Sequence, residues 1–128
     1  MASDLKTALS LIGPLEGRIM GLVWQGQVGE WFTVRDVHEA LGDPAYTTVM
    51  TTMMRLATKG ILEVGSDGGR AYLYRCALTA HEFVANVGAA QVDGLIARFG
   101  DVALAAFSRR MDGLDAEQRR RLRRLGRP

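Results

Sequence analysis

The feature that most constrains this chain is the segment 46–59, whose two sides differ in chemistry. Val49, Met53 and Leu56 recur at i, i+4 and i+7, the spacing of an amphipathic helix with one apolar face. Gly60 follows and predicts the end of this helix. The opposite side carries hydroxyl groups and one guanidinium, from Thr47, Thr48, Thr51 and Arg55, with Tyr46 at its start.

Two further helices are predicted ahead of this segment. Pro14 suits the first position of a helix over 14–24, because that position needs no backbone N–H. Thr33 and Asp36 make a capping pattern at the start of a helix over 33–41, which Gly42 ends. Between these helices, Trp31 and Phe32 predict a brief strand.

A β-hairpin is predicted directly after the third helix. Residues 61–64 and 70–76 are rich in β-prone side chains, and the turn between them, 65–69, is rich in glycine. Three helices followed by a two-stranded wing form a winged helix-turn-helix. The predicted fold class is therefore mainly α with a small β-hairpin wing, completed by a C-terminal helical region.

The C-terminal region predicts three more helices and a role in dimerisation. Thr79 and Glu82 form a capping-box pattern, and Gly100 and Gly113 separate the later helices. A short helical region cannot bury all its apolar side chains within itself, so a second copy of the chain is expected to cover them. We predict a DNA-binding domain over 1–78 and a dimerisation domain over 79–128, with dimer contacts from Val84, Val87, Leu95, Phe99, Leu104 and Phe107.

Positive charge is distributed unevenly along the chain. The net charge is +2, yet residues 1–78 hold seven basic and eight acidic side chains. Six arginines fall within the last ten residues. A solvated helical face is the favoured interpretation of this arginine run, and contact with DNA phosphates is the alternative.

The polar face of the 46–59 helix favours double-stranded DNA as the partner. Threonine hydroxyls hydrogen-bond phosphates or base edges, and Arg55 has the reach for a guanine edge or a phosphate. Arg35 and Arg70 are further candidates for phosphate contact. The near-neutral charge of 1–78 supports an alternative, a winged-helix protein-interaction module without DNA readout.

The sequence favours no enzyme, metal site or cofactor site. It contains one cysteine and two histidines, too few ligands for a familiar zinc or copper pattern. The glycines of 65–69 open no helix and so form no phosphate-binding loop. We expect neither a membrane span nor a secretory signal, and therefore a cytoplasmic protein.

Several motifs together resemble the penicillinase-repressor family. The run from Ala45 to Leu62, AYTTVMTTMMRLATKGIL, carries most of the resemblance, together with 15–24 and 33–41. The resemblance implies a homodimeric bacterial transcriptional repressor that binds a palindromic operator. It also implies that Thr47, Thr48, Thr51 and Arg55 are recognition-helix contacts.

The sequence departs from that family's pattern at two places. Induced members are cleaved at an Asn-Phe pair, whereas the corresponding region here has Ala106-Phe107 and Ser108-Arg109. The copper-responsive branch uses paired C-terminal cysteines, and no cysteine follows Cys76. We therefore expect neither cleavage at an Asn-Phe pair nor copper binding at paired cysteines. The sequence names no inducer or sensor in their place.

Overall fold

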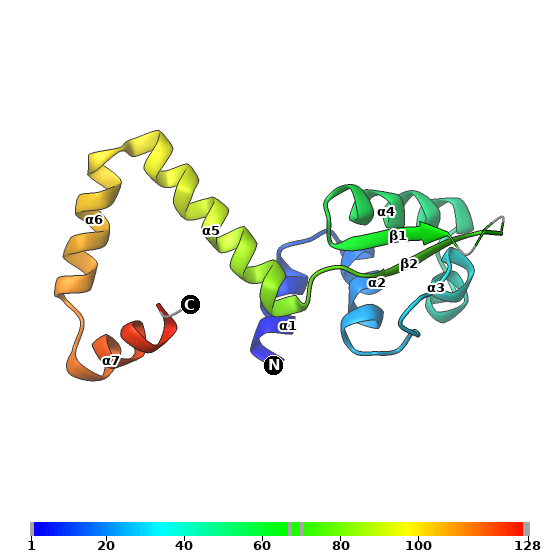
Figure 1. Cartoon of the computed structure of the whole chain (residues 1–128), viewed down its shortest axis with the longest axis horizontal. Coiled ribbons are helices and arrows are strands. Elements are labelled where there is room, and N and C mark those ends of the chain that lie inside the picture. Colours follow the sequence, from blue (N-terminus) through cyan, green and yellow to red (C-terminus); the bar gives the residue numbers. More distant parts are fainter. Residues whose placement is uncertain (1, 67, 70, 127–128) are drawn as a thin grey trace. The chain divides into compact units, whose positions relative to one another are not determined.

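The computed structural model describes residues 2–66, 68–69 and 71–126, and within them it confirms the winged-helix fold class (Figure 1). A two-stranded antiparallel sheet follows the first four helices, and further helices follow the sheet. The elements in chain order are α1 (Ala2–Ser10), α2 (Pro14–Trp24), α3 (Val34–Leu41), α4 (Tyr46–Thr58), β1 (Leu62–Ser66), β2 (Tyr72–Cys76), α5 (Ala80–Phe99), α6 (Asp101–Asp112) and α7 (Ala116–Leu125).

Helix α1 is an element that the sequence analysis did not predict. It packs against α2, and Ala8 is fully buried between them and the core. Its apolar residues Leu5, Ala8 and Leu9 recur at i, i+3 and i+4, so a helical signal was present but short. A helix of 9 residues is marginal in water by itself, so α1 depends on its packing against α2.

Local capping interactions position the two helices of the helix-turn-helix. The Thr33 hydroxyl accepts from the Asp36 N–H at 3.1 Å, and the Asp36 carboxylate accepts from the Thr33 N–H at 2.9 Å. This capping box confirms the predicted start of α3. Gly42 follows α3 with a φ of +87°, a conformation that favours glycine and turns the chain toward α4.

The hairpin joins the helical core through an isolated β-bridge between Phe32 and Tyr74. β1 and β2 pair from Leu62 opposite Cys76 to Ser66 opposite Tyr72. Phe32 and Tyr74 exchange two backbone hydrogen bonds of 2.9 and 2.8 Å, so the strand predicted at Trp31–Phe32 is present as a single bridge. Both Phe32 and Tyr74 are buried, and this bridge fixes the hairpin to the core.

The hairpin also packs against the Trp31 ring. The Arg75 guanidinium lies 4.7 Å from the ring centroid. A side chain at Gly65 would approach the same ring to 3.1 Å, closer than ordinary contact allows. The base of the wing is therefore held by side-chain packing as well as by its strand pairing.

The first turns of α5 pack on the winged-helix core. The predicted capping box is confirmed, with Thr79 and Glu82 exchanging hydrogen bonds of 3.0 and 3.1 Å. Trp24 donates from Nε1 to the Leu78 carbonyl at 2.9 Å, and its ring lies 5.8 Å from that of Phe83. These contacts explain why Phe83 is buried and why α5 begins where it does.

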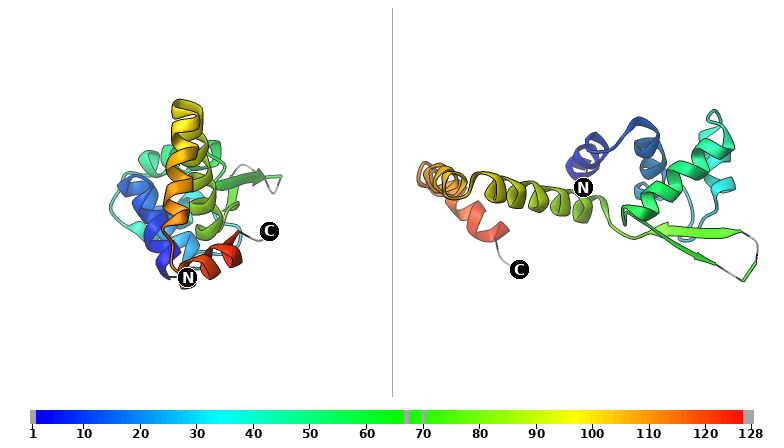
Figure 2. Two further views of the ribbon diagram at one scale, coloured as in Figure 1. Left: turned by 90° about the vertical axis from the view of Figure 1, so that its left-hand side faces the viewer. Right: turned by 90° about the horizontal axis from the view of Figure 1, so that it is seen from above.

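The chain divides into two compact units, Met1–Val87 and Gly88–Pro128, and α5 contributes to both as one unbroken helix (Figure 2). In the second unit Gly100, with a φ of +56°, separates α5 from α6. Asp115 and Gln118 form the capping box of α7, at a D-x-x-Q pattern that is visible in the sequence. Among the described residues, no helix is long and apolar enough to cross a membrane.

We predict that Thr33→Ala lowers the free energy of unfolding by about 1 kcal/mol, because it removes the acceptor that caps α3. Thr58→Ala is the matched control, since its exposed hydroxyl bonds the Met54 carbonyl within its own helix and belongs to no capping box. Urea unfolding followed by far-UV circular dichroism, at one fixed protein concentration, measures both variants. Equal losses in the two variants would contradict a capping role for Thr33.

Candidate nucleic-acid interface

The two faces of α4 lie as the periodicity predicts. Val49, Met53 and Leu56 are fully buried. The predicted contact residues Tyr46, Thr47, Thr48, Thr51 and Arg55 are all exposed. Within the first unit, these polar side chains of α4 thus face the solvent, and the apolar face holds the helix on the core.

Two adjacent threonines of α4, Thr51 and Thr52, hydrogen-bond through their hydroxyls to carbonyls of their own helix. Thr51 donates to the Thr47 carbonyl at 2.9 Å, and Thr52 donates to the Thr48 carbonyl at 2.8 Å. Thr51 is exposed, so the lone pairs of its hydroxyl are available to accept a hydrogen bond from a partner. Thr52 instead is 5% exposed and takes part in the buried face. Only the first of these two adjacent threonines is placed to meet a ligand.

Arg55 differs from most basic side chains of its unit. Across the described ranges it makes no hydrogen bond or ion pair, whereas Arg35 is paired with Glu39 at 3.1 Å. Arg70, the other predicted phosphate contact, lies outside the described residues. Arg35 is exposed on α3, but a contact with phosphate must compete with its own acidic neighbour.

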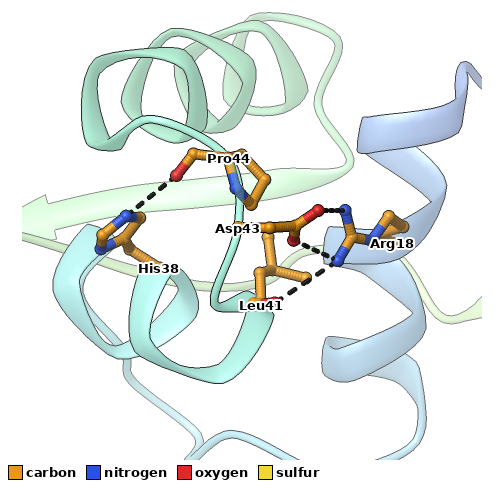
Figure 3. A network of polar contacts seen from close by, with 5 residues as sticks. All are labelled: Arg18, His38, Leu41, Asp43 and Pro44. Atoms are coloured by element: carbon orange, nitrogen blue, oxygen red, sulfur yellow. Dashed lines mark hydrogen bonds and ion pairs between the residues drawn. The ribbon is translucent and has the colours of Figure 1, made fainter.

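A polar network ties the turn between α3 and α4 to α2 (Figure 3). Arg18 donates to both carboxylate oxygens of Asp43, at 2.7 and 3.2 Å, and to the Leu41 carbonyl at 3.4 Å. The hydrogen bond from Arg18 lowers the pKa of Asp43 below its ordinary value, so this pair is ionised at neutral pH. The two-pronged geometry fixes the direction as well as the distance of the contact.

His38 holds the other side of the same turn. Its Nε2 lies 2.9 Å from the Pro44 carbonyl, which can only accept, so that nitrogen carries the proton. The ring also meets the edge of Tyr46, the first residue of α4, at 5.6 Å between centroids. His38 had no predicted role, because neither contact is visible from residue spacing. Together with Arg18, it sets where α4 begins.

An apolar groove lies beside the predicted contact face, between α4 and the hairpin. Two adjoining hollows of about 470 and 430 Å³ share Met54, Tyr72 and Tyr74 as lining residues. Met50 and Met54 are exposed, Met54 to 55%. These methionines were not among the predicted contact residues, although their i, i+4 spacing places them together on the exposed side of α4.

The described residues contain no group of three or more side chains suited to hold a metal ion. Burial raises the pKa of the Cys76 thiol, and its sulfur donates to the Leu78 carbonyl at 3.0 Å. Such a thiol is protonated at neutral pH and is a weak nucleophile.

The predicted dimer residues fall into two groups. Val84 and Val87 are partly buried against the core of the first unit. Leu95, Phe99 and Leu104 are exposed in the second unit, and Phe107 is partly buried there. Along the described part of the second unit, Ala103 alone is buried, so most of its apolar side chains lack cover from their own unit.

Known proteins are similar to this chain over most of its length. A family model described as penicillinase repressor matches residues 12–126. The chain is also 37% identical over 120 residues to the transcriptional regulator BlaI of Mycobacterium tuberculosis, in strains CDC 1551 / Oshkosh and H37Rv. Each match covers 88% of this chain and 83% of the relative.

Proposed function

Because the chain belongs to the penicillinase-repressor family, we propose that it binds a palindromic DNA operator as a homodimer and represses transcription from it. The observation that carries this proposal is the exposed face of α4, where Thr47, Thr51 and Arg55 stand free of the core. A helix of this kind fits the major groove of B-DNA, where base edges differ in their donors, acceptors and methyl groups.

The chemistry of the α4 face suits both bases and backbone. Arg55, unpaired within the described residues, has the geometry for two hydrogen bonds to a guanine or for a phosphate contact. Thr48 and Thr51 supply hydroxyls, and Met54 adds an apolar side chain that suits the C5-methyl of thymine. Arg35 and Arg70 are assigned to phosphates beside the recognition helix.

Dimerisation supplies the affinity that one winged-helix unit lacks. Its basic side chains are largely paired with acids of the same unit, so electrostatic attraction to phosphate is limited. Linking two such units makes binding of the second half-site an intramolecular step. Exposed Leu95, Phe99 and Leu104 give a second copy an apolar surface to cover.

A repressor of this kind works in the compartment that holds the genome, which in a bacterium is the cytoplasm. Its DNA affinity must fall when the target gene is needed, so an inducer or a sensor partner is part of the proposal. The departures from the family's Asn-Phe pair and cysteine pattern imply a signal other than cleavage there or copper binding at paired cysteines.

Selection of bound duplexes from a random pool tests the proposal directly. We expect the wild-type chain to enrich a palindrome, and Arg55→Ala to relax the preference at one base pair of each half-site. That loss is about 1–3 kcal/mol if Arg55 makes two hydrogen bonds to guanine. Uniform weakening across sequences would assign Arg55 to a phosphate, and enrichment of no duplex by the wild type would favour the protein-interaction module.

We further predict opposite outcomes for two adjacent threonines. Thr51→Val removes an exposed hydroxyl and weakens binding to the selected duplex by roughly 0.5–1.5 kcal/mol, the net contribution of one hydrogen bond. Thr52→Val removes a hydroxyl that is buried and bonded within α4, so the dissociation constant for the same duplex is unchanged. Fluorescence anisotropy with a labelled duplex measures both. If Thr52→Val lowered the affinity and Thr51→Val did not, the predicted recognition face of α4 would be wrong.

The dimer is tested by Phe99→Asp, with Leu11→Asp as control, since their side chains are 49% and 44% exposed. A charge at Phe99 should dissociate the dimer in sedimentation experiments and weaken operator binding by on the order of 10²-fold, because the two half-sites are then bound by separate chains. Leu11 lies between α1 and α2, outside the predicted dimer surface, and its variant should keep the wild-type mass. A dimeric Phe99→Asp chain would rule out this surface.

A further inference from the structure

Helix α7 carries a compact cationic surface. At 100° per residue, Arg120, Arg121, Arg123 and Arg124 fall within an arc of roughly 160° on one side of the helix. We call these four residues the α7 arginine face. All four are exposed, and across the described part of the chain none of them makes a hydrogen bond or ion pair. Arg119 is different, because it donates to the Leu114 and Asp112 carbonyls at 3.1 Å.

In the first unit, which contains the winged helix, most basic side chains are paired with acidic side chains. Four of its basic side chains are paired with acids of the same unit at 2.7–3.1 Å: Arg18 with Asp43, Arg35 with Glu39, Lys59 with Glu16 and Arg75 with Glu63. Of that unit's described basic residues, only Lys6 and Arg55 lack such a partner. A DNA duplex meeting this unit therefore encounters little uncompensated positive charge.

From this contrast we propose that the α7 arginine face binds the phosphodiester backbone of duplex DNA. The proposal rests on the DNA-binding function proposed above and assigns its parts to different elements. Helix α4 supplies sequence preference, whereas α7 supplies attraction to phosphate through release of the counterions condensed on the duplex. Arginine suits this role because its guanidinium forms two parallel hydrogen bonds to phosphate oxygens.

An anionic membrane surface and an acidic protein segment fit α7 less well than DNA does. A membrane-bound amphipathic helix needs a broad apolar face, and the side opposite the arginines offers only Leu122 and Leu125. An exposed ion pair between α7 and an acidic segment of a second copy would add little binding energy, because water screens it. Duplex DNA, with a negative charge about every 1.7 Å along its axis, is the denser counterpart.

The test compares charge-matched variants of the full chain. Arg120→Gln with Arg124→Gln removes two charges from the middle of the α7 arginine face. Arg109→Gln with Arg110→Gln removes two exposed charges from α6, and Arg120→Lys with Arg124→Lys keeps both charges on α7. The probe is a labelled duplex of arbitrary sequence, about three helical turns long. Its dissociation constant is measured by anisotropy over a range of roughly 50 to 200 mM NaCl, and circular dichroism checks helix content.

We expect the slope of log K against log salt concentration to become shallower by about 0.9 for each phosphate that the protein no longer neutralises, hence by about 1.8 per protomer in the α7 glutamine variant. The lysine variant and the α6 variant should keep the wild-type slope. An unchanged slope in the α7 glutamine variant overturns the proposal, and so does an equal change in the α6 variant.

The outcomes also separate this inference from the function on which it rests. If the wild-type chain enriches a palindrome but its α7 glutamine variant keeps the salt slope, the repressor function stands and the role of α7 in DNA binding does not. A wild-type chain that binds no duplex overturns both. Binding of the wild type, but not of the α7 variant, to phosphatidylserine vesicles with no change in DNA binding would assign α7 to lipid and overturn the phosphodiester contact.

Discussion

The burial of Val49, Met53 and Leu56 on one side of α4 is the constraint on which the proposed interface depends. These side chains are fully buried, and rotating the helix to expose them would cost roughly 1.5–3 kcal/mol for each. The helix therefore has one stable orientation about its axis. That orientation exposes Thr47, Thr51 and Arg55 and turns Thr52 inward.

The direction and position of α4 are set by contacts at the turn before it and beside the hairpin. Arg18 and His38 hold the turn before it from two different helices, so its first residue is fixed relative to α2 and α3. The bridge between Phe32 and Tyr74 then places the hairpin beside it. An interface that reads bases needs this rigidity, because hydrogen bonds to base edges tolerate little displacement.

The same ion pairs that stabilise the winged-helix unit also remove much of its attraction for phosphate. Exposed pairs of this kind add little to stability, since water screens them. Their larger effect is on the field of the unit, which is close to neutral. In the arrangement that we propose, α4 supplies the sequence preference. The exposed apolar side chains of the second unit supply the dimer contacts, and α7 supplies the electrostatic attraction to DNA.

Sequence alone determined the local features: the capping boxes at Thr33, Thr79 and Asp115, the ends at glycine, and the two faces of α4. Each depends on single residues or on residues no more than seven positions apart, whose relative placement the regular geometry of a helix already defines. Tertiary structure decided the rest. The contacts of Arg18 with Asp43 and of Trp24 with Leu78 join residues 25 and 54 positions apart, and no local period encodes them. The packing of Val84 and Val87 against the core of the first unit is of the same kind, because it depends on which surface the folded core leaves open.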